Sequence, residues 1–314
     1  IIMTEVSDRK VFIHIPKCGG RAIEHWLHER EQTHGAPKEL RQLEEEKLYA
    51  LMRERGTGFK EPTHLRPNSR QTADSAIAFN LFSRRPDSPL GPLFNVFVLR
   101  GDDGVFRSVW SVHTCAHVFS GMGMDMFTIT REPLSRLRSS LDYFFSGCAS
   151  DATVYSLSKA NWDLSRTPPS CDPETIRGFN QRWPLFYWVI TGVLPKLMKA
   201  LSGAMQGRFL AYVYFPLMLA RKDLLFTPMS QWLDKGGGQG MVEKRYELAT
   251  EHAKCIDDLA AWLKVPPPPA PIKGNVGAYN IVQPVSTWGS VERRIAAMYA
   301  TDFFPPYSQE ASCK

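Results

Sequence analysis

A strand–turn–helix pattern near the start of the chain constrains the fold most strongly. From Val11 the sequence reads VFIHIPKCGGRAIE, and its first five residues are β-branched or aromatic enough to predict a buried strand. Gly19 and Gly20 permit a sharp turn that brings backbone N–H groups close to a ligand. A helix starting near Arg21 would point its unpaired N–H groups at the same place. Together with the charge of Lys17, the pattern predicts a phosphate site; an ordinary βα turn is the alternative.

A second strand–helix pattern lies just over a hundred residues later. Residues 126–130 read MFTIT and predict a short strand, and Pro133 suits the first turn of a following helix. Arg131 stands at the end of the strand, where ligands of open α/β sheets bind. Ser139 follows eight residues later, so both side chains reach one phosphate only if the chain bends between them. A surface arginine with an unrelated helical serine is the alternative.

Together the two segments resemble the PAPS-dependent sulfotransferases, and among these the membrane-anchored carbohydrate sulfotransferases, which include the heparan sulfate 2-O-sulfotransferases. The first is similar to the family's 5′-phosphosulfate loop, close to IPKTGGTS, and the second to its 3′-phosphate motif, close to RDPxxRxxSxYxY. Two later stretches are more weakly similar: CDPE at 171–174 and YATDFFPPY at 299–307, the latter to the family's closing YxxDxxLY helix.

The resemblance implies a role for each matching residue. Lys17 would contact the bridging oxygen and 5′-phosphate of PAPS, and Arg131 with Ser139 would hold the 3′-phosphate. Arg21-Ala22 stands where the family has Thr-Ser, so two hydroxyl donors are missing; the guanidinium of Arg21 could replace them or point to solvent. A later Gly-containing stretch is similar to the loop that closes over PAPS, with a plain turn as the alternative. The expected cofactor-binding residues are Lys17, Cys18, Gly19, Gly20, Arg21, Ala22, Arg131, Ser139, Lys273 and Gly274.

Sulfuryl transfer needs a cation at the leaving phosphate and a base at the acceptor hydroxyl. The resemblance assigns the first role to Lys17 and the second to His117, which lies in a GHxxF-like stretch. His64 is the second candidate base. His113, on the same expected helix as His117, and the acidic Glu61 are further alternatives. No metal site is expected, because the sequence shows no convincing metal-ligand spacing.

Alternating strands and helices favour an α/β fold with a mainly parallel central sheet, and the resemblance implies a P-loop-like three-layer α/β/α architecture. A single domain over 1–314 is expected, with an insertion over 36–92 and an acceptor-side loop over 147–172. The other expected elements are a central strand at 94–100, a helix at 105–118, a helix at 133–146, helices at about 174–190 and 193–206, a strand within 211–215 and a helix at 243–264.

The charge of the chain suits an anionic cofactor and acceptor. It carries 38 Lys and Arg against 32 Asp and Glu, a formal charge of +6. Nucleic acid is not an expected partner, because the basic residues are scattered and no nucleic-acid motif occurs. The resemblance favours a glycan acceptor, with a small-molecule alcohol, phenol or amine as the alternative. Four aromatic residues could stack on a sugar or form core: Trp162, Trp183, Tyr187 and Trp188.

Cysteines and apolar stretches bear on the compartment. The resemblance favours the Golgi lumen, where family members often carry a disulfide in the region of Cys148 and Cys171; two reduced thiols in the cytoplasm are the alternative. No 18-residue apolar span occurs in the sequence. The chain begins at Ile1, which leaves two alternatives open: an upstream anchor has been trimmed, or Met3 is the true start. A membrane is expected as a partner only through such a missing N-terminal anchor. The oligomeric state stays open.

Two other functional classes remain. A kinase-like P-loop protein is disfavoured, because Lys17 precedes the glycines and no hydroxyl follows them to hold magnesium. A relative that binds PAPS or a glycan without catalysis is made plausible by Arg21-Ala22.

Overall fold

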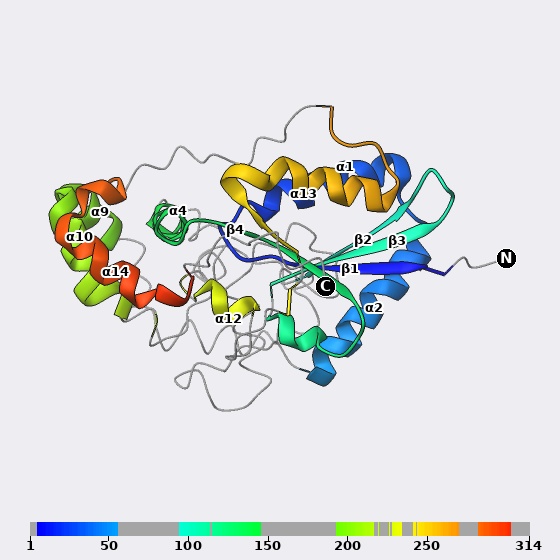
Figure 1. Ribbon diagram of the computed structural model, residues 1–314, viewed down its shortest axis with the longest axis horizontal. Helices are drawn as coiled ribbons and strands as arrows, with labels where there is room; N and C mark the ends of the chain where they lie inside the picture. The colour runs from blue at the N-terminus through cyan, green and yellow to red at the C-terminus, as the bar shows by residue number, and fades with distance from the viewer. Residues whose placement is uncertain are drawn as a thin grey trace, which may run out of the picture.

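The structure, a computed structural model, is an α/β protein built on one five-stranded sheet (Figure 1). The described residues are 5–55, 94–113, 115–145, 193–216, 219, 226, 228–233, 241–242, 244–269 and 282–302. The expected helix at 174–190 and loop at 147–172 lie outside them, as does the expected insertion beyond residue 55.

The sheet is mostly parallel, as the alternation of elements predicts. Its strand order is β2-β3-β1-β4-β5. β1 runs parallel to β3 and β4, β4 runs parallel to β5, and β2 is an antiparallel edge strand paired with β3. The strands are β1 (Asp8–Ile13), β2 (Phe94–Arg100), β3 (Phe106–Val112), β4 (Asp125–Thr130) and β5 (Lys244–Glu247).

Helices surround the sheet and form a second group at one end of the molecule. The longer helices are α1 (Gly20–His34), α2 (Lys38–Arg55), α4 (Pro133–Phe145) and α13 (Leu248–Leu263). The shorter ones are η3 (Ala116–Phe119), α9 (Leu194–Ala200), α10 (Gly203–Phe209), η6 (Leu210–Tyr214), α12 (Met229–Leu233), η7 (Val285–Thr287), η8 (Gly289–Val291), α14 (Glu292–Met298) and η9 (Ala300–Asp302).

Contacts from β1 show that helices cover both faces of the sheet. Successive strand residues point to opposite faces. Arg9 donates from Nε to Glu44 of α2 at 2.6 Å, whereas the ammonium of Lys10 lies 5.0 Å from the ring centroid of Trp262 on α13. α2 and α13 therefore lie on opposite faces, and Figure 1 shows α1 on the same side as α13.

Two apolar clusters hold these layers together. The larger one lies between the sheet and its helices and includes Phe12, Trp26, Trp110, Trp232 and Leu259. The second joins α4 to the helices at the end of the molecule opposite the start of β1 (Figure 1) and includes Leu137, Leu210, Phe215, Trp288 and Tyr299. α4 thus packs in the second cluster, while the turn that precedes α4 lies at the carboxyl edge of the sheet.

The expected helix over 105–118 is wrong, because residues 106–112 form β3. Phe106, Val109 and Trp110 have the spacing of one helical face, which favoured a helix. The strand is buried almost throughout, so the alternation that marks a half-exposed strand is missing from its sequence. The strand at 94–100 is present, but it is the edge strand of the sheet and not a central one.

Three further boundaries differ from expectation. Residues 211–215 are not a strand, because α10 continues through the π-helical η6. The expected helix at 243–264 begins with the short strand β5 before α13, and the helix at 193–206 is split into α9 and α10. The helix at 133–146 is confirmed as α4. No helix among the described residues is long and apolar enough to cross a bilayer.

The packing of α13 can be tested with a matched pair of leucines. Leu259 on α13 is 4% exposed and Leu43 on α2 is 39% exposed. We expect Leu259→Ala to lower the free energy of unfolding by about 2–5 kcal/mol, through lost burial and a residual cavity. Leu43→Ala should change it by less than about 0.5 kcal/mol. Urea unfolding followed by circular dichroism measures both, and equal losses would contradict this packing.

Candidate anion-binding site at the carboxyl edge of the sheet

Three parallel strands end side by side and bring distant residues together. β1 lies between β3 and β4, so the residues that follow these strands share one edge. They are His14 after β1, His113 after β3 and Arg131 after β4. This carboxyl edge is where open α/β sheets bind ligands.

The turn after β1 combines a half-buried cation with a tight backbone. Lys17 has a φ of 68° and Gly19 a φ of 85°, and the left-handed conformation is unfavourable for Lys17. The amide of Cys18 donates to the carbonyl of Ile15 at 3.3 Å, which closes the turn. Gly19 then caps α1, so the positive end of a 15-residue helix meets Lys17 at this turn.

Packing from both sides requires the two glycines of the turn. A Cβ on Gly20 would collide with the imidazole of His14, and it would lie 2.8 Å from Cζ of Phe12. A Cβ on Gly19 would collide with a methyl group of Leu248 at the start of α13. The turn is therefore enclosed between the aromatic end of β1 and α13, and its backbone has little freedom to move.

Two arginines of the second segment bind the carbonyl groups of this turn. Arg131 donates from Nη1 to the carbonyl oxygen of Lys17 at 3.3 Å. Arg136 is fully buried and donates from Nε to the carbonyl oxygen of Pro16 at 3.1 Å. Burial lowers the pKa of Arg131 from its ordinary value, yet a guanidinium stays charged at neutral pH. The structure thus brings the two sequence segments into direct contact.

Cys18 is a buried thiol in this turn. Its sulfur lies 3.7 Å from the sulfur of Met229 on α12. Burial raises the pKa of Cys18 to about 11, against the opposing pull of Arg136 and Arg131. The group is therefore a neutral thiol at pH 7 and does not provide a thiolate nucleophile.

A largely buried carboxylate, that of Glu24 on α1, binds side chains from β2, from β3 and from the residue that follows β1. Glu24 of α1 accepts hydrogen bonds from Ser111 Oγ at 2.7 Å, Asn95 Nδ2 at 3.0 Å and His14 Nδ1 at 3.1 Å. Burial opposes its ionisation, but His14, His113 and Ser111 together hold the pKa of Glu24 below its usual range. Glu24 is therefore a buried anion that fixes the side chain of His14.

His113 is held in one tautomer next to this carboxylate. Its Nδ1 lies 2.7 Å from the carbonyl oxygen of His14. A carbonyl only accepts, so Nδ1 carries the proton and Nε2 of the neutral ring carries a lone pair. Burial, together with the nearby His14 and Arg21 and against the pull of Glu24, lowers the pKa of His113 to about 3. His113 is neutral at pH 7.

His117, the expected base, lies on η3 and is half-buried. The helix α12 connects η3 to the turn, because Cys115 donates to the carbonyl oxygen of Gln231 at 3.1 Å while Met229 contacts Cys18. The element that carries His117, η3, and the turn after β1 therefore both contact α12.

The remaining expected site residues divide into two groups. Ser139 is half-buried on α4, roughly two helical turns beyond Arg131. His64, Lys273, Gly274, Cys148 and Cys171 lie outside the described residues. The cysteines of the described part are Cys18, Cys115 and Cys255, all buried and free.

Several residues of the site were not among the residues expected from the sequence. Asp302 accepts backbone hydrogen bonds from Met229 at 2.8 Å and Ser230 at 2.9 Å, although burial raises its pKa. His252 of α13 is half-buried, and its ring forms a hydrogen bond with the backbone of Gly19. Asp302 fell within a stretch with a weak family resemblance, whereas the partners of Arg136, Glu24 and His252 lie too far along the chain for any pattern to show them.

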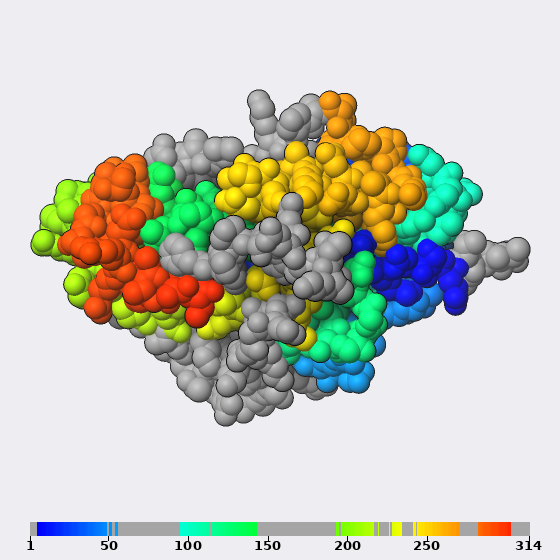
Figure 2. Space-filling model, in the orientation of Figure 1, coloured from blue at the N-terminus to red at the C-terminus, as the bar shows by residue number. Residues whose placement is uncertain are grey.

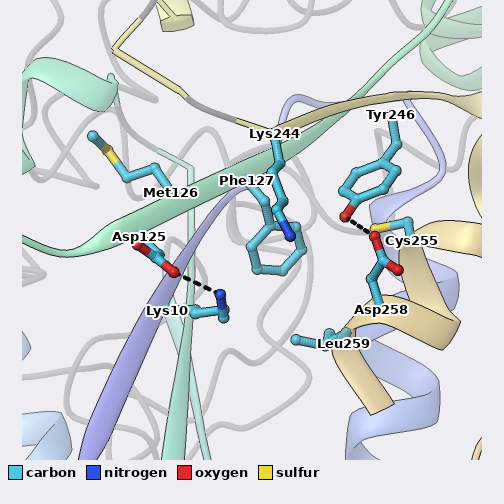
Figure 3. Close-up of a pocket in the computed structure, with 9 residues that line it drawn as sticks. All are labelled: Lys10, Asp125, Met126, Phe127, Lys244, Tyr246, Cys255, Asp258 and Leu259. Carbon is cyan, nitrogen blue, oxygen red and sulfur yellow. Dashed lines mark hydrogen bonds and ion pairs between the residues drawn. The ribbon is translucent and has the colours of Figure 1, made fainter. Parts of the chain in front are cut away.

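A small cavity at the opposite end of the strands offers no comparable site. It is lined by Lys10, Asp125, Lys244, Tyr246 and Asp258 among others, and its volume of about 30 Å³ suits one water molecule (Figure 3). Lys10 is paired with Asp125 at 2.7 Å, and Tyr246 donates to Asp258 at 2.7 Å. No group of three or more metal-ligating side chains occurs in the part of the chain that the structure describes.

Comparisons of the chain with protein-family models, with curated proteins and with solved structures find no match.

The state of His113 predicts a loss of stability in acid. An unfolded histidine titrates near pH 6.5, whereas His113 resists protonation down to about pH 3. Between these values the unfolded chain binds more protons, so stability falls as pH falls. We expect His113→Gln to reduce the loss of unfolding free energy between about pH 7 and pH 5. His25→Gln, at a side chain that is 64% exposed, should leave the loss unchanged; equal slopes in all three proteins would contradict the burial of His113.

The enclosure of the turn predicts a coupled effect at Gly20. Gly20→Ala should lower the free energy of unfolding by about 1–3 kcal/mol, because the new methyl group overlaps the ring of His14. In a His14→Ala background the same change should cost less, since most of the obstructing ring is gone. A double-mutant cycle by urea unfolding measures the coupling. Additive effects would show that the two residues are not in contact.

Proposed function

We propose that the protein is a PAPS-dependent sulfotransferase with a P-loop-like three-layer fold, and that its acceptor is a carbohydrate hydroxyl. The observation that carries the proposal is the hydrogen bond from Arg131 to the carbonyl oxygen of Lys17 at 3.3 Å. It joins the two segments that resemble the family's phosphate-binding motifs. The family resemblance also makes the Golgi lumen the proposed compartment, with the cytoplasm as the alternative.

The charges at the carboxyl edge fit an anionic nucleotide. Lys17, Arg131 and the amino end of α1 bring positive charge to the turn, and Arg136 adds a buried charge behind it. Glu24 hydrogen-bonds to His14, and Asp302 accepts two amides of α12. Each carboxylate thus already has hydrogen-bond partners, so neither faces the turn as an unpaired negative charge.

Arg21 provides a specific reason to expect a phosphate at this point. Its Nε atom is buried without a hydrogen-bond partner among the described residues. Its charge also reaches His113, whose pKa it lowers, so the side chain belongs to the carboxyl edge. A phosphate oxygen would satisfy this donor with a charge-assisted hydrogen bond. Arg21 thereby replaces the two hydroxyl groups that the family provides at this position.

The proposed reaction is an in-line displacement at sulfur. A bond forms between the acceptor oxygen and sulfur, and the bond between sulfur and the 5′-phosphate oxygen breaks. Lys17 stabilises the negative charge that develops on that phosphate oxygen, while Arg131 and Ser139 position the 3′-phosphate. The proton of the acceptor hydroxyl passes to a histidine. The products are a sulfate ester and adenosine 3′,5′-bisphosphate.

We assign the base to His117, with His64 as the second candidate. His113 stands beside the turn in the correct tautomer, but a pKa of about 3 makes it a weak proton acceptor at neutral pH. It is better suited to hold the carbonyl group of His14, to which it donates. We therefore assign a positioning role to His113 and proton transfer to His117.

Substitution of the two cations tests the proposed site. We expect Lys17→Ala and Arg131→Ala each to lower sulfate transfer by at least about 100-fold, the loss typical of removing one preorganised charge donor. Lys10→Ala is the matched control, because Lys10 lies on β1, away from the turn that carries Lys17, and is paired with Asp125. Transfer from radiolabelled PAPS to a panel of polysaccharides and small acceptors gives the rates, and circular dichroism checks folding. Wild-type rates in both site variants would exclude the assignment.

Two histidine variants test the assignment of the base. His117→Ala should lower the maximal rate by at least about 100-fold and flatten the acid limb of the pH–rate profile. His113→Ala should have a smaller effect on rate at neutral pH and keep that limb. A larger loss in His113→Ala than in His117→Ala would identify His113 as the base, whereas full activity of both variants would favour His64.

A second candidate function is binding of PAPS without catalysis. The absence of the family's two hydroxyl donors in the first turn of α1, where Arg21-Ala22 stands, favours it, because these groups normally contact the reacting phosphate. Calorimetric binding of PAPS without transfer to any acceptor in the panel would support this alternative over the enzyme.

A further inference from the structure

Exposed apolar side chains are concentrated on one short segment. Of the six large apolar residues that are exposed within the described part of the chain, five lie between positions 193 and 213, with exposed fractions of 39–59%. The sixth is Leu43 on α2. The five are Val193, Leu197, Met205, Tyr212 and Val213. We call them and the basic residues between them the α9–η6 face; it belongs to the lime-green helices at the left end of the molecule (Figures 1 and 2).

The helix that runs through α10 and η6 is apolar on both sides. Its inner side is buried in the second apolar cluster through Leu210, Tyr214 and Phe215. Its outer side exposes Met205 and Tyr212, which are 54% and 59% exposed. A helix that is apolar all round is normally buried. The outer side is therefore suited to contact a second apolar surface.

The segment that makes up the face carries positive charge and no acidic residue. Residues 193–216 contain Lys196, Lys199 and Arg208 but no Asp or Glu, and all three cations are exposed. α14 adds Arg294, whose guanidinium lies 4.5 Å from the ring centroid of Tyr212. Aliphatic, aromatic and basic side chains thus alternate along this segment, and Arg294 of α14 joins them at Tyr212.

We propose that the α9–η6 face docks the protein on the surface of a membrane that contains anionic lipids. Its apolar side chains would enter the boundary between headgroups and acyl chains, and its cations would bind the headgroups. A soluble anionic polymer would leave Leu197, Met205 and Val213 exposed to water. A second copy of the chain would bring like charges together across a symmetric contact. The proposal does not depend on the sulfotransferase assignment. Because anionic lipids face the cytoplasm, it goes with the cytoplasmic alternative and not with the Golgi lumen.

Co-sedimentation with vesicles tests the proposal directly. Vesicles of phosphatidylcholine with phosphatidylserine are compared with vesicles of phosphatidylcholine alone, and the fraction of the full chain in the pellet is measured. We expect the protein to pellet with the anionic vesicles and much less with the neutral ones. Added salt should weaken binding, because it screens the contacts with the headgroups.

Matched substitutions locate the contact. Met205→Glu and Val213→Glu should each weaken binding at least about tenfold, because each puts a negative charge in place of an apolar side chain that contacts the lipid when the protein is bound. Lys196→Ala and Lys199→Ala should each weaken it about fivefold. Leu43→Glu and Lys38→Ala on α2 are the controls and should bind like wild type. Circular dichroism of each variant checks that the fold is kept.

Three results would overturn the proposal. The wild-type protein could stay in the supernatant with both kinds of vesicle. The control variants on α2 could lose binding as strongly as the variants on the face. Sedimentation velocity could show a dimer that Met205→Glu converts to monomer without vesicles, which would assign the face to a second copy of the chain.

Discussion

The hydrogen bonds from Arg131 and Arg136 to the carbonyl oxygens of Lys17 and Pro16 hold the candidate site together. Each joins residues more than a hundred positions apart, so the turn after β1 and the segment after β4 are held against each other. Arg136 is fully buried, and burial of a guanidinium is costly unless its donors are satisfied. The carbonyl oxygen of Pro16 is one acceptor that meets this need. The position of the first segment is therefore coupled to that of the second.

A second constraint comes from the carboxylate of Glu24. Glu24 binds side chains that come from β2, β3 and the end of β1, and it fixes the imidazole of His14. That ring in turn leaves no room for a side chain at Gly20. Glycine is thus required at position 20 for packing, in addition to any close approach of a ligand. Removing one partner of such a buried charge is expensive, which links the stability of the fold to the geometry of the site.

Local patterns predicted the two strand–helix units and the mostly parallel α/β class, because strand, turn and helix signals lie within a few residues of one another. β3 was missed because a strand buried on both faces lacks alternation, and η6 because its apolar run is equally compatible with a strand. The contacts of Arg136, Glu24 and His113 could not be read from the sequence, since their partners depend on strand order. The order of the sheet also made 94–100 an edge strand, which no local signal distinguishes from a central one.

We propose that the carboxyl edge of the sheet recognises a nucleotide with phosphates on both the 3′ and the 5′ oxygen of its ribose. Isothermal titration calorimetry with adenosine 3′,5′-bisphosphate and with adenosine 5′-monophosphate tests it without any acceptor. We expect the wild-type protein to bind the bisphosphate at least about tenfold more tightly, and Arg131→Ala to remove this preference, the loss typical of one charge-assisted contact. Equal affinity for the two nucleotides, or a preference that survives in Arg131→Ala, would contradict it.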